Sequence, residues 1–511
     1  MSGVYDPPYP IPYNPIRGTT SAPAGVMTAY NVKDYGAYGD GVHDDTAAIQ
    51  AALNAGGNVW VPYTALGYLC RVLTIPPGSS LFFAPGAYFV APSDLATSWL
   101  AASADTYQGS QIIGGTFVAT DATNPGITAV IDFSAAVSCP NLRIAGNRIV
   151  NAPVHGIFVR EATTATTPPK WVEGNSIEGY GLAATGFGIY GDYIGNLKVL
   201  HNGIVPGPTA YDGIELGHAG SYISTGLTML CEGNTLSGTG INFPLSDGAK
   251  ILGNTIVNSP EGIQNDANTA NDVVIANNTL LAITPAAGYA GIRVDGSNPV
   301  IVGNRVEVTT GDGISGTSLY YASVVANRIS STASAATGSA INDGSSGGRN
   351  SIIGNVISST ASGQGFSYGI TTTGDYNTVT GNNMVAGATN GINNSGQFSV
   401  FSDNDLDVFG TPVVATGTAN NVYRNNRPYN PVGSSVPGTA FSLPASGTAW
   451  TNNTGVDGTL FVTAAGTVTD VVVQGVTVGS SLAVGQQLHI PAGGTFTLTY
   501  SAAPTLVFVG N

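Results

Sequence analysis

The residues with the greatest capacity for chemistry follow a short unit that recurs along the middle of the chain. The unit is a small residue followed by isoleucine, and its copies include Gly156-Ile157, Gly188-Ile189, Gly213-Ile214, Gly240-Ile241, Gly262-Ile263, Gly291-Ile292, Gly313-Ile314 and Ala340-Ile341. If each isoleucine points into a core, the residues one and three places later point outward, because side chains alternate along a strand. One outward column then contains Phe158, Tyr190, Glu215, Asn242, Gln264 and Arg293, and the next contains Arg160, Asp192, Asp266 and Asp295. This strip concentrates acidic, basic and aromatic side chains in a chain of which only 9% is charged.

Pairs of carboxylates from this strip are candidates for cleaving a glycosidic bond. Repeats stacked about 4.8 Å apart would place Asp192 diagonal to Glu215, and Asp266 directly beside Asp295. Carboxylates at such distances raise one another's proton affinity, so that one donates a proton while the other activates water or attacks. We therefore predict that these four acids are catalytic, with retaining and inverting mechanisms both open. The prediction includes no metal ion and no cofactor.

Other residues near the acids are candidates for binding a sugar polymer. Two insertions, 162–170 and 217–228, would wall a groove, and the second carries His218 and Tyr222. Aromatic rings such as Tyr190 and Trp171 stack on sugar faces. The predicted substrate-binding set is Tyr190, Trp171, Arg160, His218, Tyr222, Gln264 and Arg293. A purely structural interpretation stays open for each of them, since outward acids are often only solvated and aromatic residues favour strands.

Such a strip requires a solenoid, and a second repeat indicates one. An asparagine lies between two apolar residues about every 20 to 32 residues. The copies lie at Asn147, Asn175, Asn234, Asn254, Asn304, Asn327 and Asn355, with weaker ones at Asn202, Asn278, Asn382 and Asn404. Helical repeats need about 33 residues or more, whereas these segments are short, rich in β-branched residues and alternate with period two. The pattern predicts a parallel β-helix with asparagines stacked at one corner.

Composition narrows the set of partners and compartments. The formal charge of −15 repels nucleic acids and anionic membranes, so we expect neither as a partner. Three cysteines are too few for a disulfide framework and are expected to be buried thiols. No signal peptide is visible at the N-terminus, and no stretch approaches 18 apolar residues. An extracellular or virion protein released by lysis fits these features.

The chain divides into three parts. Residues 1–28 are rich in proline and predict an extended arm. Residues 29–430 predict the β-helix, beginning with a helix in which Asp44 or Asp45 is the N-cap and Ala48, Ile49, Ala52 and Leu53 form the apolar face. Residues 438–511 contain short strands separated by glycine turns, which predicts a small β-sandwich. The fold class is therefore all-β.

The segment from Tyr30 to Leu53, followed by Val59-Trp60-Val61-Pro62, resembles the N-terminal signature of the pectate-lyase-like superfamily. This superfamily of right-handed β-helices includes bacteriophage tailspikes and many polysaccharide-active enzymes, and the resemblance covers about 30–430. It implies a homotrimer supported by the C-terminal domain, with the N-terminal arm attached to a virion. The motifs of polygalacturonases and the Asp-Pro-His-Asp motif of alginate epimerases are absent from the coils.

The preferred interpretation is a tailspike-like depolymerase that cuts a cell-surface polysaccharide internally by hydrolysis. One alternative is a lyase of the same fold, which needs a base such as Lys170 or Lys198 and a Ca²⁺ ion. Another is an adhesin that binds the glycan without cutting it. The sequence leaves open the identity of the glycan, a viral or bacterial origin, and a site within one chain or between chains.

Overall fold

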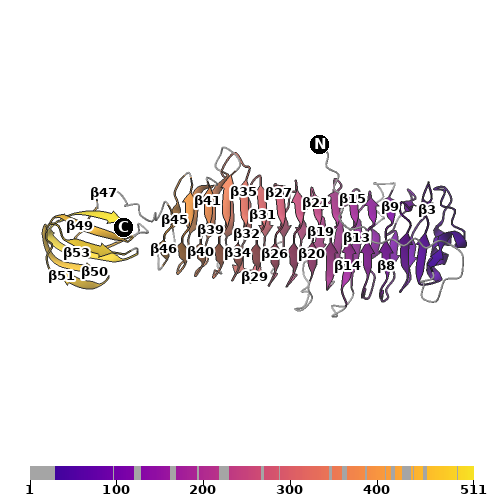
Figure 1. The fold of residues 1–511 in the computed structure, drawn as a ribbon, viewed down its shortest axis with the longest axis horizontal. Coiled ribbons are helices and arrows are strands. Elements are labelled where there is room, and N and C mark those ends of the chain that lie inside the picture. The colour runs from indigo at the N-terminus through magenta and orange to yellow at the C-terminus, as the bar shows by residue number, and fades with distance from the viewer. Residues whose placement is uncertain are drawn as a thin grey trace.

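The computed structural model describes residues 29–510 except 96, 120–127, 162–167, 193–194, 218–228, 245, 266–269, 287, 345–347, 360–364, 386–387, 409, 416–420, 428–438, 441, 453–456 and 492. The described chain forms a long rod of coils followed by a separate β domain (Figure 1).

The rod is a right-handed parallel β-helix built from three parallel sheets, as the sequence predicts. Sheet A contains β1 (Ala29–Asn31), β2 (Asn58–Val61), β5 (Ser80–Phe83), β8 (Gln111–Ile113), β11 (Arg143–Ala145), β14 (Lys170–Glu173), β17 (Leu197–Leu200), β20 (Leu230–Glu232), β23 (Lys250–Leu252), β26 (Val274–Ala276), β30 (Val300–Val302), β34 (Ser323–Val325), β37 (Ser351–Ile353), β40 (Thr378–Thr380), β43 (Val400–Ser402) and β46 (Val422–Arg424). Sheet B contains β3 (Tyr68–Leu69), β6 (Tyr88–Ala91), β9 (Thr116–Ala119), β12 (Arg148–Val150), β15 (Ser176–Tyr180), β18 (Gly203–Pro206), β21 (Thr235–Ser237), β24 (Thr255–Val257), β27 (Thr279–Ile283), β31 (Arg305–Val308), β35 (Arg328–Ser331), β38 (Val356–Ser359), β41 (Asn383–Val385) and β44 (Asp405–Asp407).

Sheet C, the third side of the rod, carries the predicted strip. It contains β4 (Leu73–Ile75), β7 (Leu100–Ala102), β10 (Ala129–Phe133), β13 (His155–Arg160), β16 (Ile189–Asp192), β19 (Ile214–Leu216), β22 (Ile241–Asn242), β25 (Ile263–Gln264), β28 (Ala290–Arg293), β32 (Asp312–Gly316), β36 (Ser339–Asp343), β39 (Phe366–Thr372), β42 (Ala388–Asn394) and β45 (Val413–Ala415). A two-stranded ribbon, β29 (Gly296–Ser297) with β33 (Leu319–Tyr320), lies between sheets C and A in chain order.

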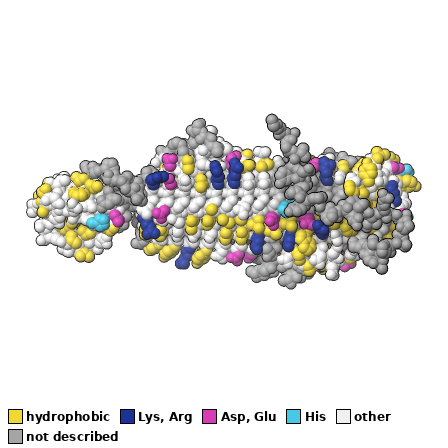
Figure 2. All heavy atoms as spheres, viewed as in Figure 1, with side chains coloured by type: hydrophobic (Ala, Val, Ile, Leu, Met, Phe, Trp, Pro, Cys, Tyr) yellow, Lys and Arg dark blue, Asp and Glu magenta, His cyan; other side chains and the backbone are white. Residues whose placement is uncertain are grey.

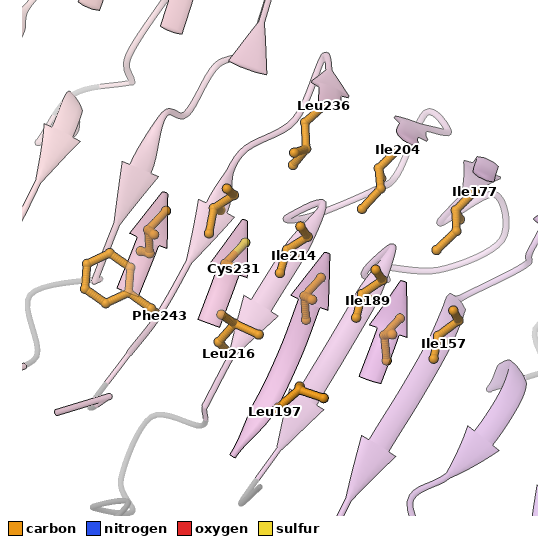
Figure 3. Packing of buried hydrophobic residues seen from close by; sticks show 14 of the residues in the cluster. Ile157, Ile177, Ile189, Leu197, Ile204, Ile214, Leu216, Cys231, Leu236 and Phe243 are labelled. Carbon is orange, nitrogen blue, oxygen red and sulfur yellow. The ribbon is translucent and has the colours of Figure 1, made fainter. Parts of the chain in front are cut away.

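The core of the rod consists of apolar side chains stacked from coil to coil. Ile157, Ile189 and Ile214 pair in register on sheet C and are fully buried. Isoleucine and leucine side chains of sheet B lie across the interior from them (Figure 3). This stacking is the physical reason for the Gly-Ile repeat, because every coil must supply an inward side chain at the same height.

The asparagine repeat forms a continuous hydrogen-bonded ladder at the corner between sheets A and B. Asn254 is typical: its Nδ2 donates to Asn278 Oδ1 (3.0 Å) and to the carbonyl of Cys231 (3.0 Å), and its backbone N–H also donates to Asn278 Oδ1 (2.8 Å). The ladder members are Asn147, Asn175, Asn202, Asn234, Asn254, Asn278, Asn304, Asn327, Asn355, Asn382, Asn404 and Asn426. The predicted stacking of asparagines is thus confirmed.

The N-terminal end of the rod is covered by the predicted helix. A 3₁₀ helix, η1 (Val32–Tyr35), precedes α1 (Thr46–Asn54), which buries Ile49, Ala52 and Leu53 against the first strands. The carboxylate of Asp45 accepts hydrogen bonds from the backbone N–H groups of Tyr38 and Gly39 and so ties the preceding loop to the helix start. None of the helices in the described ranges is long and apolar enough to cross a bilayer.

The C-terminal domain is a sandwich of two antiparallel sheets, as predicted. One sheet is β47 (Thr439–Ala440), β54 (Thr505–Gly510), β49 (Gly458–Ala464) and β52 (Gln487–Ile490), and the other is β48 (Ala449–Thr451), β53 (Thr495–Ala502), β50 (Thr467–Val473) and β51 (Val476–Gly479). Leu506 and Phe508 of the apolar tail are buried in the core of this sandwich.

Candidate functional site

The outward column on sheet C is in register from coil to coil. The residues that pair along it are Phe158, Tyr190, Glu215, Asn242, Gln264, Arg293, Ser315 and Asn342. Arg160 pairs with Asp192 in the second column. Asp192 follows Tyr190 by two residues and therefore lies diagonal to Glu215, the arrangement expected from the sequence.

The two acids of the first predicted pair have different surroundings. Asp192 is 4% exposed, and its Oδ2 lies 3.4 Å from Arg160 Nε. Glu215 is 7% exposed and lies between the strands that carry Tyr190 and Asn242. Arg160 thus partly neutralises Asp192, whereas the cross-strand neighbours of Glu215 are uncharged.

Two further acids, Asp212 and Glu261, lie beside Glu215 and were not among the predicted residues. Each precedes an isoleucine by two residues, Ile214 in one coil and Ile263 two coils later. In both coils the strand begins at the isoleucine, so these acids belong to the corner that leads into sheet C. Side chains alternate between inward and outward only within a strand, not in a corner. The sequence prediction considered only the positions after each isoleucine and therefore missed Asp212 and Glu261.

Asp212 and Glu261 form a pair of neighbouring carboxyl groups. Asp212 is 1% exposed, and the side chains of the two acids are within hydrogen-bonding range. Burial raises the pKa of Asp212 well above its ordinary value, and the hydrogen bond and charge of Glu261, followed by the charge of Glu215, raise it further. Asn242 Nδ2 donates to Asp212 Oδ2 (3.2 Å), which offsets part of this effect. The pair therefore keeps a proton at a pH where an isolated aspartate is ionised.

The polar groups around the pair are not all satisfied. Gln264 is 1% exposed, and neither its Oε1 nor its Nε2 has a hydrogen-bond partner among the described residues. Asp212 Oδ1 likewise receives no hydrogen bond within this part of the chain. Native proteins rarely leave buried amides unbonded, and such groups are typical of sites that bind a ligand.

An aromatic cluster adjoins the acids on the N-terminal side. Tyr190 stacks on Phe158 (ring centroids 4.6 Å apart) and on Phe187 (4.7 Å), and Tyr211 meets Phe187 edge to face (5.7 Å). The His155 ring stacks on the Phe187 ring, and His155 Nδ1 accepts a hydrogen bond from the backbone N–H of Phe187 (3.0 Å). Burial lowers the pKa of His155 to about 4, so its ring is neutral at pH 7. Half-buried rings beside carboxylates form a surface suited to the apolar faces of sugars.

Asp295, one acid of the second predicted pair, is held by hydrogen bonds within the chain. Asp295 is 1% exposed, and its carboxylate accepts hydrogen bonds from the backbone N–H groups of Thr317 and Ser318, from the Thr317 hydroxyl and from Arg293 Nε. These bonds hold the following turn in place. Asp266, its predicted partner, lies outside the described residues, as do His218 and Tyr222.

A hollow of about 450 Å³ lies farther along the same sheet. Its lining includes Arg293, Tyr289, Asp312, Thr317 and Asn342. Gln264 and Arg293 pair across neighbouring strands, so the hollow continues the strip beyond the acids.

Three other candidates lie away from sheet C. Trp171 and Lys198 are neighbours on sheet A, where Lys198 Nζ lies 5.6 Å from the Trp171 ring centroid. Lys170 is fully buried, and its Nζ donates to Glu161 Oε2 (2.7 Å) and to the carbonyl of Gly195. None of the three contributes a side chain to the group formed by Asp212, Glu215 and Glu261, hereafter the acid cluster. No group of three or more histidine, cysteine or acidic side chains in the described ranges is arranged to hold a metal ion.

Comparison with known proteins supports the resemblance drawn from the sequence. Residues 29–162 match the family described as "Rhamnogalacturonase A/epimerase, pectate lyase-like". Among solved structures, a double mutant of the tailspike protein of Escherichia coli bacteriophage HK620, in complex with a pentasaccharide, is 11% identical with a TM-score of 0.56, over 94% of this chain and 93% of that chain. A mutant of the same tailspike in complex with a hexasaccharide is 12% identical with a TM-score of 0.55 and the same coverage. The resemblance to pectate-lyase-like β-helices and tailspikes is therefore confirmed at the level of the fold.

Similarity to curated proteins is confined to short segments. The "Non-secreted LysM effector LysM15" of Penicillium expansum is 46% identical over 75 residues, which is 14% of this chain and 5% of that protein. The mannuronan C5-epimerase AlgE5 of Azotobacter vinelandii is 66% identical over 38 residues, 6% of this chain and 4% of that protein. The chain thus spans only a small share of the length of these relatives.

Proposed function

We propose that this protein is a tailspike-like depolymerase that binds a cell-surface polysaccharide along sheet C and cleaves it internally by glycoside hydrolysis. The observation that carries the proposal is the carboxyl pair Asp212–Glu261 next to Glu215, in which burial and the neighbouring acids raise the pKa of Asp212. Glycoside hydrolysis requires an acid that is protonated near neutral pH and a second carboxylate that is not. In the proposal the cluster supplies both: Asp212 and Glu215 belong to one coil, and Glu261 lies two coils later.

Each acid has a distinct role in this proposal. Glu261 is the more exposed member of the pair, so it passes a proton to the glycosidic oxygen, and Asp212 holds that proton in the free protein. Glu215 supplies the second carboxylate, and Asp192 with Arg160 borders the site on the neighbouring coil. Water provides the hydroxyl group of the new reducing end.

The residues on either side of the acids support a polymer as the substrate. The aromatic cluster around Tyr190 lies on one side, and Gln264 and Arg293 lie on the other. Five stacked coils from β13 to β25 span roughly 20 Å at about 4.8 Å each, which is the length of several sugar units. A strip of this length favours internal cleavage over removal of a terminal sugar.

We further propose that the protein acts outside cells as a homotrimer, with the C-terminal sandwich supporting assembly and residues 1–28 attaching it to a virion. The support is the similarity to a phage tailspike over nearly the whole length of both chains.

Incubation with a panel of bacterial surface polysaccharides tests the catalytic proposal. We expect one polymer to gain reducing ends and lose size without gaining ultraviolet absorbance. An unsaturated, ultraviolet-absorbing product would instead identify a lyase, and binding without loss of polymer size would identify an adhesin; either result overturns the proposal.

Substitution then tests the site itself. Asp212→Asn, Glu215→Gln and Glu261→Gln should each abolish most of the cleavage while the protein still binds the polymer. Glu307→Gln is the matched control, because Glu307 is an outward acid on sheet B, a different side of the rod. Full activity in all three site variants would exclude this cluster as the catalytic centre.

A further inference from the structure

The outer face of sheet A is apolar over most of the length of the rod. Most of its three-residue strands point the first and third side chains outward and bury the second, whereas the third residues Ala145, Ala276 and Ser402 are buried. The apolar outward residues are Leu200, Leu230, Leu252, Val274, Val300, Val302, Val325, Ile353, Val400 and Val422. Figure 2 shows them as a yellow stripe along the rod. Val300 and Ile353 are each 36% exposed, which is high for aliphatic side chains on the face of a sheet.

The stripe is too long to be ordinary surface. From β17 to β46 it spans ten coils, which at about 4.8 Å per step is roughly 43 Å, and it is interrupted at β40, whose outward residues are Thr378 and Thr380. Monomeric proteins rarely expose a continuous apolar patch of more than a few hundred Å², and larger patches usually mark an interface. Sheet B, in contrast, mixes polar outward residues such as Thr279, Arg305 and Glu307 with separate apolar ones, Val205, Val356 and Val385.

A row of strained residues at one edge of the stripe gives a second, independent indication. Tyr321, Arg349, Tyr376 and Phe398 occupy equivalent corners before four successive sheet A strands, and each has a φ between 54° and 60°. At the corresponding corner of earlier coils the residue is Asn141, Asn196 or Asn298. The left-handed conformation costs a bulky residue about 1–2 kcal/mol more than it costs glycine.

These large side chains nevertheless remain at the surface. Tyr376 and Phe398 stack with centroids 5.0 Å apart and are 51% and 43% exposed, and Arg349 lies over the Tyr376 ring at 5.1 Å. Stacking among themselves does not bury them. A partner that covers sheet A would also cover this edge, which accounts for bulky rings at positions where asparagine causes less strain.

The charges on the N-terminal part of the face indicate which partner fits. First-position residues there include the cations Arg143, Lys198 and Lys250, and third-position residues include the acids Glu173 and Glu232. The first-position edge of this part of the face therefore carries the cations and the third-position edge the acids, and Arg143 already pairs with Glu173 within the chain. When two copies of such a face pack in parallel about an axis along the rod, the first-position edge of one copy meets the third-position edge of the other at the same height.

In parallel packing, Lys198 of one copy lies at a height between Glu173 and Glu232 of the second copy. The apolar coils of one copy then face the apolar coils of the other. Antiparallel packing would bring the charged coils against the apolar end and each edge against itself, so that Lys198, Lys250 and Glu232 would meet no opposite charge on the second copy. The face is self-complementary in only one of the two directions.

We infer that the outer face of sheet A is the surface through which copies of this chain associate side by side in parallel. The inference deepens the proposed self-association by assigning its surface, and it rests on that proposal for the identity of the partner. Since sheet C is a different side of the coil, this packing leaves the acid cluster open to a polymer.

Oxidative cross-linking of the full-length chain tests the inference. In Val300→Cys/Val302→Cys, both thiols lie on one coil of sheet A and face a partner's thiols at the same height. The native Cys70, Cys139 and Cys231 are fully buried and do not compete. We expect covalent dimers and higher species on a denaturing gel at micromolar protein. The matched control, Thr279→Cys/Leu281→Cys, puts two thiols on sheet B one coil away and should stay monomeric on the gel.

Light scattering of the unmodified protein separates the two ways the inference could fail. A monomeric mass would overturn the proposed self-association together with the surface. An oligomeric mass without sheet A cross-links, or with cross-links from the sheet B pair, would overturn only the surface. Failure of the sheet A thiols to react with iodoacetamide in a monomer would show that another segment of this chain covers the face, and would also overturn the inference.

Discussion

Two stacks of buried polar side chains run along the same rod and differ in how well they are satisfied. In the asparagine ladder every member is at most 1% exposed, and each side chain from Asn147 to Asn404 donates to the next. On sheet C, Asp212 and Gln264 are equally buried, yet Asp212 Oδ1 and both polar atoms of Gln264 have no hydrogen-bond partner among the described residues. Within the described ranges, hydrogen bonding is therefore complete at the asparagine corner and incomplete beside sheet C.

This difference in hydrogen bonding indicates a stabilising role for the asparagine ladder and a functional role for Asp212 and Gln264. A buried polar atom without a partner costs about 1–3 kcal/mol, whereas a satisfied one is close to neutral or favourable. The ladder recovers the cost of burial within the chain. The sheet C cluster does not do so among the residues that the structure describes, and under the proposed function the hydroxyl groups of a sugar supply the missing partners.

The largest expected effect concerns the acid cluster. Asp212→Asn should reduce the rate of polysaccharide cleavage about 10³-fold, because general acid catalysis contributes typically 10²–10⁴-fold. The same substitution should leave the free energy of unfolding at pH 7 unchanged or higher, because a neutral amide replaces a buried acid whose raised pKa makes its ionised form costly in the fold. Reducing-end assays and denaturant titrations measure the two quantities on one sample.

A loss of stability in step with the loss of cleavage would contradict this distinction. Asp192→Asn is an informative companion, since Asp192 already pairs with Arg160. Its substitution should reduce cleavage less than that of Asp212.

The ladder should show the opposite behaviour. Asn278→Leu leaves the backbone N–H and the Nδ2 of Asn254 without their acceptor and the carbonyl of Ile251 without its donor. We expect a loss of about 3 kcal/mol from the free energy of local opening, because each orphaned group costs about 1–3 kcal/mol. Hydrogen exchange of the coils from β23 to β31 measures it, since coils of a solenoid contact mainly their neighbours.

Thr255→Val, an outward change on the adjacent strand β24, is the control and should leave exchange as it was. Equal protection in both variants would mean that the ladder contributes nothing to the stability of the rod.

The repeat pattern of the sequence was sufficient to predict the rod and the register of sheet C. Every coil needs an inward apolar residue at the same height, so Ile189, Ile214 and Ile241 mark the same position in three coils. The outward columns after them followed from alternation within a strand. Glu215 and Asp192 were located in this way.

The rest of the site depends on contacts that no period encodes. Asp212 and Glu261 lie in corners before their strands, where the local backbone sets the direction of a side chain. Asp295 has the spacing of a groove acid, but donors from Thr317 and Ser318 in the next turn occupy its carboxylate. Trp171 is close in sequence to the insertion predicted to wall the groove. It lies on β14 of sheet A, however, and therefore not on the side of the rod that carries the acids.

The carboxyl pair also gives the stability of the rod a pH dependence of defined sign. Because the pKa of Asp212 is raised in the folded state, the folded protein binds this proton more tightly than the unfolded chain. The free energy of unfolding therefore falls as the pH rises from about 4 through the raised pKa. In Asp212→Asn this contribution should vanish, as denaturant titrations between pH 4 and 8 would show.

His155 has the opposite effect on the pH dependence of the free energy of unfolding, and its substitution makes this test more specific. Burial lowers its pKa to about 4, so its contribution to stability is lost as the pH falls below about 6.5. His155→Gln should therefore steepen the decline with rising pH that Asp212→Asn flattens. Identical pH profiles in the parent and in Asp212→Asn would show that the acid does not hold its proton in the fold.

The smallest expected effect is the most direct comparison of the two stacks. Gln264→Met keeps the length of the side chain but removes its amide, just as Asn278→Leu removes an amide from the ladder. Because the Gln264 amide has no partner among the described residues, its loss should leave the free energy of unfolding unchanged or raise it by about 1 kcal/mol. Affinity for the polysaccharide should fall several-fold, because a hydrogen bond to a sugar hydroxyl is lost. Calorimetric titration with the glycan and denaturant unfolding measure the two changes. A destabilisation as large as that of Asn278→Leu would mean that Gln264 is a structural residue, and the contrast between the ladder and the acid-bearing face would no longer hold.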